Sequence, residues 1–211
     1  MTRTYVALAL FLAAGCSSGG ATAHVVVPPS GPASSAPGTP SPPAGSPVQQ
    51  AVPAEKNPPG DIPDNVAFVA YRNVPGRYTF SHPEGWAETT RGATVTFTDK
   101  LNGVQAMPGT ATTAPTAARA QQHDIPQLRR SQAAFELRGI SAVTEPAGRG
   151  VRIVYRRNSA PDAVTGRQYR DEVERYELVS GSRAVVVELY GPVGSDNVDA
   201  YRTMITSLRL T

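Results

Sequence analysis

The side chains that could bind a metal ion are few and widely spaced in this sequence. His82 and Glu84 stand two positions apart, so along a continuous strand they could share one face and bind a metal together. The proline between them favours a turn instead, and a third ligand would have to come from a distant part of the chain. His123 precedes Asp124, which we expect to start a helix as its N-cap, and His24 stands alone. The sequence therefore predicts neither a metal site nor another cofactor.

Nucleophilic and acid–base residues also lack the arrangement that catalysis needs. A nucleophilic serine is held on a sharp turn between a strand and a helix, whereas the Ser-Gly-Ser string at 180–182 lies between two expected strands. Asp171 and Glu172 are adjacent, so on a strand they point to opposite faces and do not form an acid–base pair. The Gly-Arg-Gly string at 148–150 predicts a hairpin turn rather than a phosphate-binding loop. We expect no enzyme, although a triad assembled from scattered residues would leave no signal in the sequence.

Arginines are frequent in the second half of the chain, where a patch could bind anionic lipid or wall polymer. The candidates are Arg149, Arg152, Arg156, Arg157, Arg167 and Arg170. Glu172 and Glu174 lie on the next expected strand, and opposite charges facing each other across strands contribute about 0.2–1 kcal/mol per pair. We therefore expect an ion-paired surface rather than a free basic patch. The net charge of +3, from 20 basic and 17 acidic residues, gives no indication of a nucleic-acid partner.

Cys16, the single cysteine of the chain, has the most specific expected chemistry. Arg3, an apolar stretch at 5–14 and small residues before the cysteine form the layout of an export signal with its cleavage site. The apolar stretch is too short to span a bilayer, which needs roughly 20 residues. The string Leu-Ala-Ala-Gly-Cys at 12–16 resembles the bacterial lipobox, in which the cysteine is acylated. We expect a signal peptide at 1–15 and lipidation of Cys16; an ordinary signal peptide with an incidental cysteine is the alternative.

The stretch at 16–65 is expected to be the lipidated cysteine followed by a disordered tether. It is rich in Pro, Ser, Gly and Ala and carries few charges, so it cannot bury enough apolar surface to offset the entropy of ordering. Residues 66–211 differ in composition and are numerous enough for one domain with a core. We expect this domain to be extracytoplasmic and lipid-anchored to the bacterial cell membrane through Cys16.

Alternating apolar residues and turn signals predict mainly strands in this domain. Strands are expected at 76–82, 93–98, 104–107, 134–144, 151–155, 167–180 and 184–190. The Asn-Gly pair at 102–103 is typical of a hairpin turn. One helix is expected after Asp124, a short one at 116–123, and a final one capped by Ser195. The final helix would bury Val198, Tyr201, Ile205 and Leu208. This order predicts an α+β fold with a mainly antiparallel β-sheet and helices packed on it.

The apolar residues of the expected strand at 167–180 change face part-way along it. Tyr169 and Val173 point one way. Tyr176 and Leu178 point the other way, and a side-chain period of two cannot place all of them inward. One extra residue near positions 174–175 would restore the phase, so a β-bulge is predicted there. The alternative is a strand covered on both faces.

Three local strings carry a resemblance to a known family: YTFSHPEGW at 78–86, FTDKLNGV at 97–104 and MITSL at 204–208. Together with the order of elements, residues 74–210 resemble the PsbP-like (Mog/PsbP) fold family, which includes an extrinsic photosystem subunit and actinobacterial Lpq-type lipoproteins. The resemblance implies a bacterial lipoprotein with a small non-catalytic binding or accessory domain and a protein as its partner. A carrier of a lipid or other small hydrophobic ligand and a cell-envelope hydrolase are the alternatives that the sequence leaves open.

Overall fold

The computed structural model describes residues 49–56 and 60–211, so the expected signal peptide, Cys16 and most of the expected tether lie outside the described residues. The strands are Phe68–Asn73 (β1), Tyr78–Pro83 (β2), Ala87–Arg91 (β3), Thr94–Asp99 (β4), Asn102–Thr110 (β5), Glu136–Glu145 (β6), Gly148–Asn158 (β7), Arg170–Ser180 (β8), Arg183–Pro192 (β9) and Arg209–Leu210 (β10). The helical segments are Ala117–Arg119 (α1), Ala120–Asp124 (η1, a π-helix), Ile125–Ser131 (α2) and Val198–Ser207 (α3). Within the described residues, no helix is long and apolar enough to span a bilayer.

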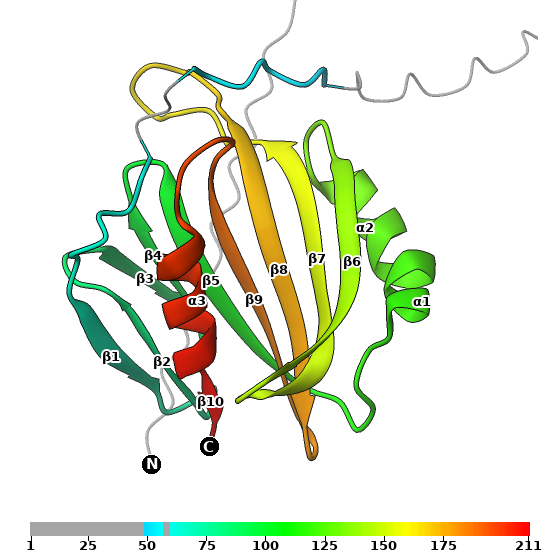
Figure 1. The fold of residues 1–211 in the computed structure, drawn as a ribbon. Helices are drawn as coiled ribbons and strands as arrows, with labels where there is room; N and C mark the ends of the chain where they lie inside the picture. Colours follow the sequence, from blue (N-terminus) through cyan, green and yellow to red (C-terminus); the bar gives the residue numbers. More distant parts are fainter. Residues whose placement is uncertain (1–48, 57–59) are drawn as a thin grey trace, which may run out of the picture. The chain divides into compact units, whose positions relative to one another are not determined.

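The strands form two antiparallel sheets (Figure 1). The larger sheet has seven strands in the order β3-β4-β5-β9-β8-β7-β6, and β1, β2 and β10 form the smaller one. The expected α+β fold with a mainly antiparallel sheet and helices packed on it is confirmed. The sequence does not predict β1, β3 and β10, which all lie at sheet edges. β3, for example, is exposed along its whole length and has no apolar alternation.

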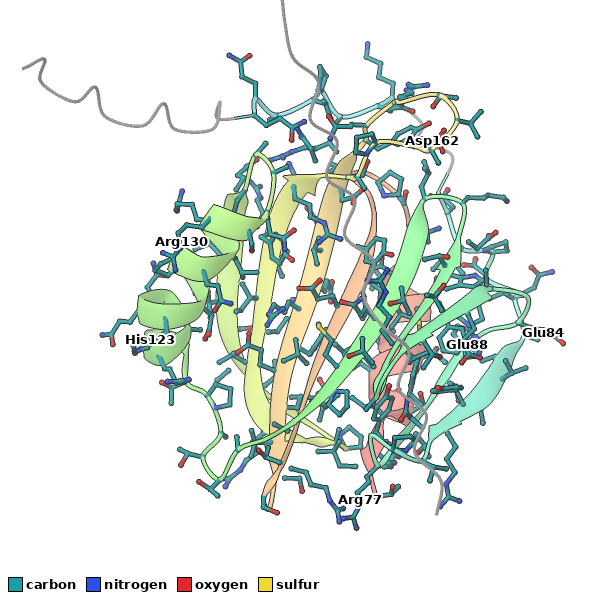
Figure 2. All side chains as sticks on the ribbon, turned by 180° about the vertical axis from the view of Figure 1, so that it is seen from behind. Arg77, Glu84, Glu88, His123, Arg130 and Asp162 are labelled. Carbon is teal, nitrogen blue, oxygen red and sulfur yellow. The ribbon has the colours of Figure 1, made fainter. Side chains whose placement is uncertain are left out.

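The larger sheet is covered on both faces, and each face has its own core. α3 and the smaller sheet cover the first face, so α3 lies in front of the sheet in Figure 1 and behind it in Figure 2. The first core contains Tyr78, Phe97, Tyr176, Leu178, Leu189 and Met204. The segment from α1 to α2 covers part of the second face. The second core contains Ile125, Leu128, Ile153, Tyr155 and Val173.

β8 is a regular strand in the middle of this arrangement. Its pairing with β7 and β9 continues without a register shift, so the β-bulge predicted near positions 174–175 is wrong. The alternative is confirmed: Val173 packs in the second core, whereas Tyr176 and Leu178 pack in the first. Because both faces are buried, the apolar residues can change face without any change in the strand. The register shift of this sheet lies instead in β6, between Leu137 and Gly139.

The helix expected after Asp124 begins earlier and runs continuously from α1 through η1 into α2. Its N-cap is Thr116, whose hydroxyl accepts a hydrogen bond from a backbone N–H in the first turn, so the expectation that Asp124 caps a helix is wrong. Pro126 lacks an N–H and its ring crowds the carbonyl four residues before it. The preceding turn widens into a π-helix, in which the Ile125 N–H donates to the carbonyl of Ala120.

α3 also begins later than expected. Its first residue follows Asn197, and Ser195 makes no capping hydrogen bond, so the predicted Ser195 cap is wrong. Val198, at the start of the helix, is 60% exposed and does not belong to the buried face. The other three residues expected on that face are buried: Tyr201, Ile205 and Leu208.

The expected hairpin between β4 and β5 is present, but its turn lies two residues before the Asn-Gly pair. Lys100, in a left-handed conformation (φ 51°), and Leu101 form the turn, and Asn102 is the first residue of β5. The Asn102 side chain is needed inside the domain, because its amide donates to the carbonyl of Gly60 at 2.7 Å and accepts from Asn197 at 2.9 Å. The turn signal in the sequence thus identifies the hairpin but not the turn residues.

The hairpin between β6 and β7 shows the same displacement. Residues 146–147 form the turn, and Gly148 and Gly150, expected in it, are part of β7. A side chain at Gly150 would collide with the carbonyl oxygen of Glu177 on β8, so the close approach of the strands requires glycine there. The turn predicted at 180–182 is confirmed between β8 and β9.

The packed structure begins before residue 66, where the domain was expected to start. Ile62 is 5% exposed and belongs to the first core. Its N–H donates to the side-chain oxygen of Asn197 at 2.8 Å, and Asn197 is also bonded to Asn102. The packed domain therefore includes residues that the composition assigns to the tether.

Candidate functional site

A cleft opens at the end of the larger sheet where β7, β8 and the β4–β5 turn meet. It has a volume of about 240 Å³. Its lining includes Lys100, Arg157, Asp162, Tyr169, Asp171 and Tyr190, and we call it the tyrosine cleft. The lining comes together because antiparallel pairing brings the end of β7, the start of β8 and the end of β9 to one edge of the sheet. Asp162, in the loop between β7 and β8, is labelled near the top of Figure 2.

Charged residues continue from the cleft along the second face of the sheet. Arg175 donates to Glu188 and to Glu177, each at 2.7 Å. Arg157 lies 3.8 Å from Glu188 and 3.7 Å from Asp171. The register explains this row, because Arg157 pairs with Asp171 and Arg175 pairs with Glu188 across neighbouring strands. We call these five residues the charged row.

Asp171 is the most buried carboxylate of the charged row. Its side chain is only 4% exposed, and Nε of Arg157 lies 3.7 Å from its Oδ2, which is too long for a hydrogen bond. Burial raises the pKa of Asp171 to about 6, although the Arg157 guanidinium opposes this rise. A carboxylate that loses its hydration in a cleft and gains no short hydrogen bond in return is a candidate binding group.

Arg157 and Tyr190 are fixed in place beside Asp171. The Arg157 guanidinium lies 5.1 Å from the centre of the Tyr190 ring and donates to the side-chain oxygen of Gln132 at 2.9 Å. The ring occupies space that a side chain at Gly103 would need, so glycine at this position lets Tyr190 lie against β5. Burial raises the pKa of the Tyr190 hydroxyl.

The loop at 159–169 forms the outer wall of the cleft and is held by its own hydrogen bonds. Oδ1 of Asp162 accepts from the N–H and the hydroxyl of Thr165, each at 2.8 Å, and these bonds lower the pKa of Asp162. The N–H of Tyr169 donates to the Ser159 hydroxyl at 2.9 Å. The Arg167 guanidinium lies 5.0 Å from the centre of the Tyr169 ring. The wall is therefore built before any ligand arrives.

Residues 49–56, which we call the strap, lie against the same end of the sheet (cyan in Figure 1). Asn158 holds them with both ends of its amide: Oδ1 accepts from the N–H of Val52 at 3.0 Å, and Nδ2 donates to the carbonyl of Gln50 at 2.7 Å. Glu55 forms an ion pair with Arg167 of the loop. The strap thus ties the N-terminal part of the described chain to the wall of the tyrosine cleft.

A second, wider depression of about 470 Å³ lies beside Trp86, under residues 60–63. Glu84 is at its rim, whereas His82 stacks on Phe97 with ring centres 3.6 Å apart. Burial lowers the pKa of His82, and its Nδ1 lies 2.9 Å from the carbonyl of Pro83. The two side chains that could have shared a metal therefore do not converge. No group of three His, Cys, Asp or Glu side chains suited to a metal occurs in residues 49–56 and 60–211.

Two other groups considered in the sequence as possible site residues, His123 and the Ser-Gly-Ser turn, lie away from the cleft. His123 is exposed on η1 at the edge of the molecule (Figure 2). The Ser-Gly-Ser turn at 180–182 lies at the opposite end of β8 (Figure 1). Asp171 and Glu172 point to opposite faces of β8, as predicted, because Asp171 faces Arg157 while Glu172 pairs with Arg156.

Five of the six arginines singled out in the sequence form ion pairs, as predicted, whereas Arg149 has no acidic partner within 4.0 Å among the described residues. Arg152 pairs with Glu174, and Arg156 donates to Glu172 at 2.8 Å. Arg170, almost fully buried, donates to Glu136 at 2.9 Å. The remaining pairs of this set are Arg157–Asp171, Arg157–Glu188 and Arg167–Glu55.

The sequence does not predict the tyrosine cleft. Its only local signal is Asp171, an acid two residues before the buried Val173 on the same strand face. The partners that give Asp171 its environment, Arg157 and Tyr190, come from other strands. No periodicity within one strand identifies them.

No family model and no curated protein matches this chain. Solved structures of similar fold include a cyanobacterial PsbP (CyanoP) from Synechocystis, 15% identical over 69% of this chain and 94% of that chain, with a TM-score of 0.47. The Ran-binding protein Mog1p of Saccharomyces cerevisiae is 9% identical over 69% of this chain and 96% of that chain, with a TM-score of 0.44. A Bacteroides thetaiotaomicron protein is 13% identical, with 67% and 48% covered and a TM-score of 0.38, so this chain spans about half its length. These likenesses concern the fold alone.

Proposed function

We propose that this chain is a bacterial lipoprotein, anchored outside the cytoplasm by an acylated Cys16, whose α+β domain is a non-catalytic binding module for a protein partner. The export-signal layout and the lipobox-like string at 12–16 support the anchor. The Pro/Ser/Gly-rich stretch that follows suits a spacer between membrane and domain.

The tyrosine cleft is the observation that supports a binding module. It is an open site whose outer wall is held in place by hydrogen bonds within the loop at 159–169. Ser159, the serine in its lining, donates to the carbonyl of Ala160 at 2.9 Å rather than to a base. A catalytic serine needs a base within hydrogen-bond reach, so this arrangement favours binding over hydrolysis.

A carrier of a lipid or other small hydrophobic ligand receives less support from the same geometry. Such a site is usually a largely apolar concavity that buries most of its ligand. The tyrosine cleft and the depression beside Trp86 are open, and both have charged residues in their walls. Binding of a polar surface of another protein fits these walls better.

The anchor is tested by Cys16→Ser. The variant is expected to incorporate no labelled palmitate and to leave the membrane fraction, or to accumulate with its signal peptide intact. Normal palmitate labelling of the variant would contradict the lipoprotein proposal.

The binding module is tested by photocrosslinking in intact cells. A photoreactive amino acid replaces Val164, which is exposed in the loop that forms the wall of the cleft, and a matched variant carries it at Ser182, at the opposite end of β8. A protein adduct formed from position 164 but not from position 182 is the expected result. Adducts of equal yield from both positions, or none from position 164, would contradict a partner at the cleft.

A further inference from the structure

We propose that the tyrosine cleft receives a cationic side chain, lysine or arginine, from the protein partner, with the buried Asp171 carboxylate as its counterion. This proposal rests on the proposed function, because it names the chemistry by which the same site would recognise its partner. It is carried by the burial of Asp171, the charge of its surroundings, the walls of the cleft and its size.

Asp171 is a carboxylate that the described residues leave incompletely paired. Its side chain is 96% buried in a wall of the cleft, and its one charged neighbour within 4.0 Å among those residues is Arg157, 3.7 Å away. A buried carboxylate normally accepts several short hydrogen bonds, because otherwise it loses its hydration without compensation. An ammonium or guanidinium group entering the cleft would supply the missing donors.

The charged row carries one more negative than positive charge. Its carboxylates are Asp171, Glu177 and Glu188, and its guanidiniums are Arg157 and Arg175. Arg175 is bonded to both glutamates at 2.7 Å. Asp171 is left with Arg157, which it shares with Glu188. One added cation would balance the row.

An anionic ligand fits the cleft less well. Arg157 lies within 4.0 Å of two carboxylates and donates to Gln132, so little of its charge is available. Lys100 and Asp162 both line the cleft and are both exposed at its rim, where their charges offset each other. The group that lacks hydrogen-bond donors deep in the cleft is therefore the Asp171 carboxylate.

Tyr169 and Tyr190 provide walls suited to a long cationic side chain. Their hydroxyls make no hydrogen bond to any residue that the structure describes, so both can accept one from an ammonium or guanidinium group. Their rings can contact the methylene groups of lysine or arginine. Both rings already have an arginine at about 5 Å, which shows that cations are accommodated beside them.

The size of the cleft and its rim indicate a side chain of a protein rather than a free small molecule. The volume of about 240 Å³ is below the roughly 300–1,000 Å³ of typical small-molecule sites. Val164, at the tip of the loop that forms the wall, is 92% exposed. An exposed apolar residue beside a charged cleft would contact the surface that surrounds an inserted lysine or arginine.

The test uses the full chain carrying Cys16→Ser and four small probes: the N-acetyl methylamides of lysine, arginine, norleucine and glutamate. Binding is followed by NMR through the aromatic signals of Tyr169 and Tyr190. The lysine or arginine probe is expected to give saturable shifts, whereas norleucine and glutamate give none. Asp171→Asn should weaken binding about tenfold or more, since the acceptor loses its negative charge and the ion pair with the probe is lost. Glu172→Gln, one residue away on the opposite face, should leave affinity unchanged.

Three results would overturn the proposal: norleucine binding as tightly as lysine, glutamate binding at the cleft, or unchanged affinity of Asp171→Asn for the cationic probes. Tyr169→Ala, outside the strands, is a second variant and should weaken cation binding several-fold without unfolding the domain. The outcome is separable from that of the proposed function. Failure of every probe with a retained crosslink at position 164 would reject the cationic group alone. Binding of the cationic probes without a crosslink at position 164 would reject the protein partner alone.

Discussion

Replacing Asp171 with asparagine would remove a carboxylate whose ionised form is disfavoured by burial. Burial raises the pKa of Asp171 from its ordinary value of 3.8 to about 6, against the effect of Arg157. The unfolded chain loses this proton near pH 4 and the folded chain only near pH 6, so stability is lost as the pH rises between these values. At about 1.4 kcal/mol per pKa unit, the loss above pH 6 is about 3 kcal/mol. Asparagine has nearly the same shape, so Asp171→Asn should be more stable by up to about 3 kcal/mol at pH 7.5.

Urea unfolding at a series of pH values from 4 to 8 measures this effect. The free energies of unfolding of the variant and the unsubstituted protein should be similar near pH 4 and diverge as the pH rises to 7. For a domain of about this size, 3 kcal/mol corresponds to a rise in melting temperature of roughly 6–12 °C. Glu172→Gln is the control: it breaks the partly exposed pair with Arg156 and should lower stability by about 0.2–1 kcal/mol.

Two results would refute this reasoning. A lower stability of Asp171→Asn than of the unsubstituted protein at pH 7.5 would show that the Arg157 ion pair outweighs the cost of burial. A gain of the same size at pH 4 and at pH 7.5 would show that ionisation of Asp171 is not its cause. A stabilising substitution in a binding group is expected on general grounds, because functional sites retain charges that the fold alone would not favour.

Three further substitutions test the packing of the domain. Gly150→Ala should lower the free energy of unfolding in urea by about 3 kcal/mol or more, because the added methyl group would collide with the carbonyl oxygen of Glu177 on β8. Gly139→Ala is the control and should be nearly neutral, because a methyl group there has open space. Equal effects of the two substitutions would contradict this packing. Asn158→Ala removes both hydrogen bonds to the strap and should speed proteolysis within residues 49–56 about tenfold, whereas an unchanged rate would show that the strap is held otherwise. Asn102→Ala leaves the Gly60 carbonyl and the side-chain Nδ2 of Asn197 without the partners they have in Asn102, and should cost about 1–3 kcal/mol. A stability within about 0.5 kcal/mol of the original, the scatter of surface substitutions, would argue against that network.

The sequence predicts the elements whose signals are local. The alternation of Tyr78 and Phe80, and the helical spacing of Tyr201 and Ile205, place buried faces correctly because each pattern lies within one element. The turn at Gly181 is also correct, since a left-handed residue (φ 60°) favours glycine wherever the turn lies. The α+β class follows from the order of these elements.

The predictions that fail depend on contacts between distant segments. Asn102 belongs to β5 rather than to a turn because its amide bonds to Gly60 and Asn197, far away in the sequence. Ser195 does not cap α3, and Asp124 lies inside a helix that Thr116 has already started. Tertiary hydrogen bonds decide the place of Asn102, and an earlier cap decides that of Asp124, whereas the buried Ser195 hydroxyl makes no hydrogen bond among the described residues.

The sequence by itself determined the fold class, and it predicts an export signal that ends at Cys16, which stays a prediction. The arrangement at the tyrosine cleft was decided only by the tertiary structure. Whether the apolar residues of β8 required a bulge or two covered faces depended on which elements pack against it, and two cores cover it. Asp171 meets Arg157 and Tyr190 because three strands pair in one register, and its pKa follows from that burial. Desolvation depends on every neighbour in space, and a linear pattern contains only neighbours in sequence.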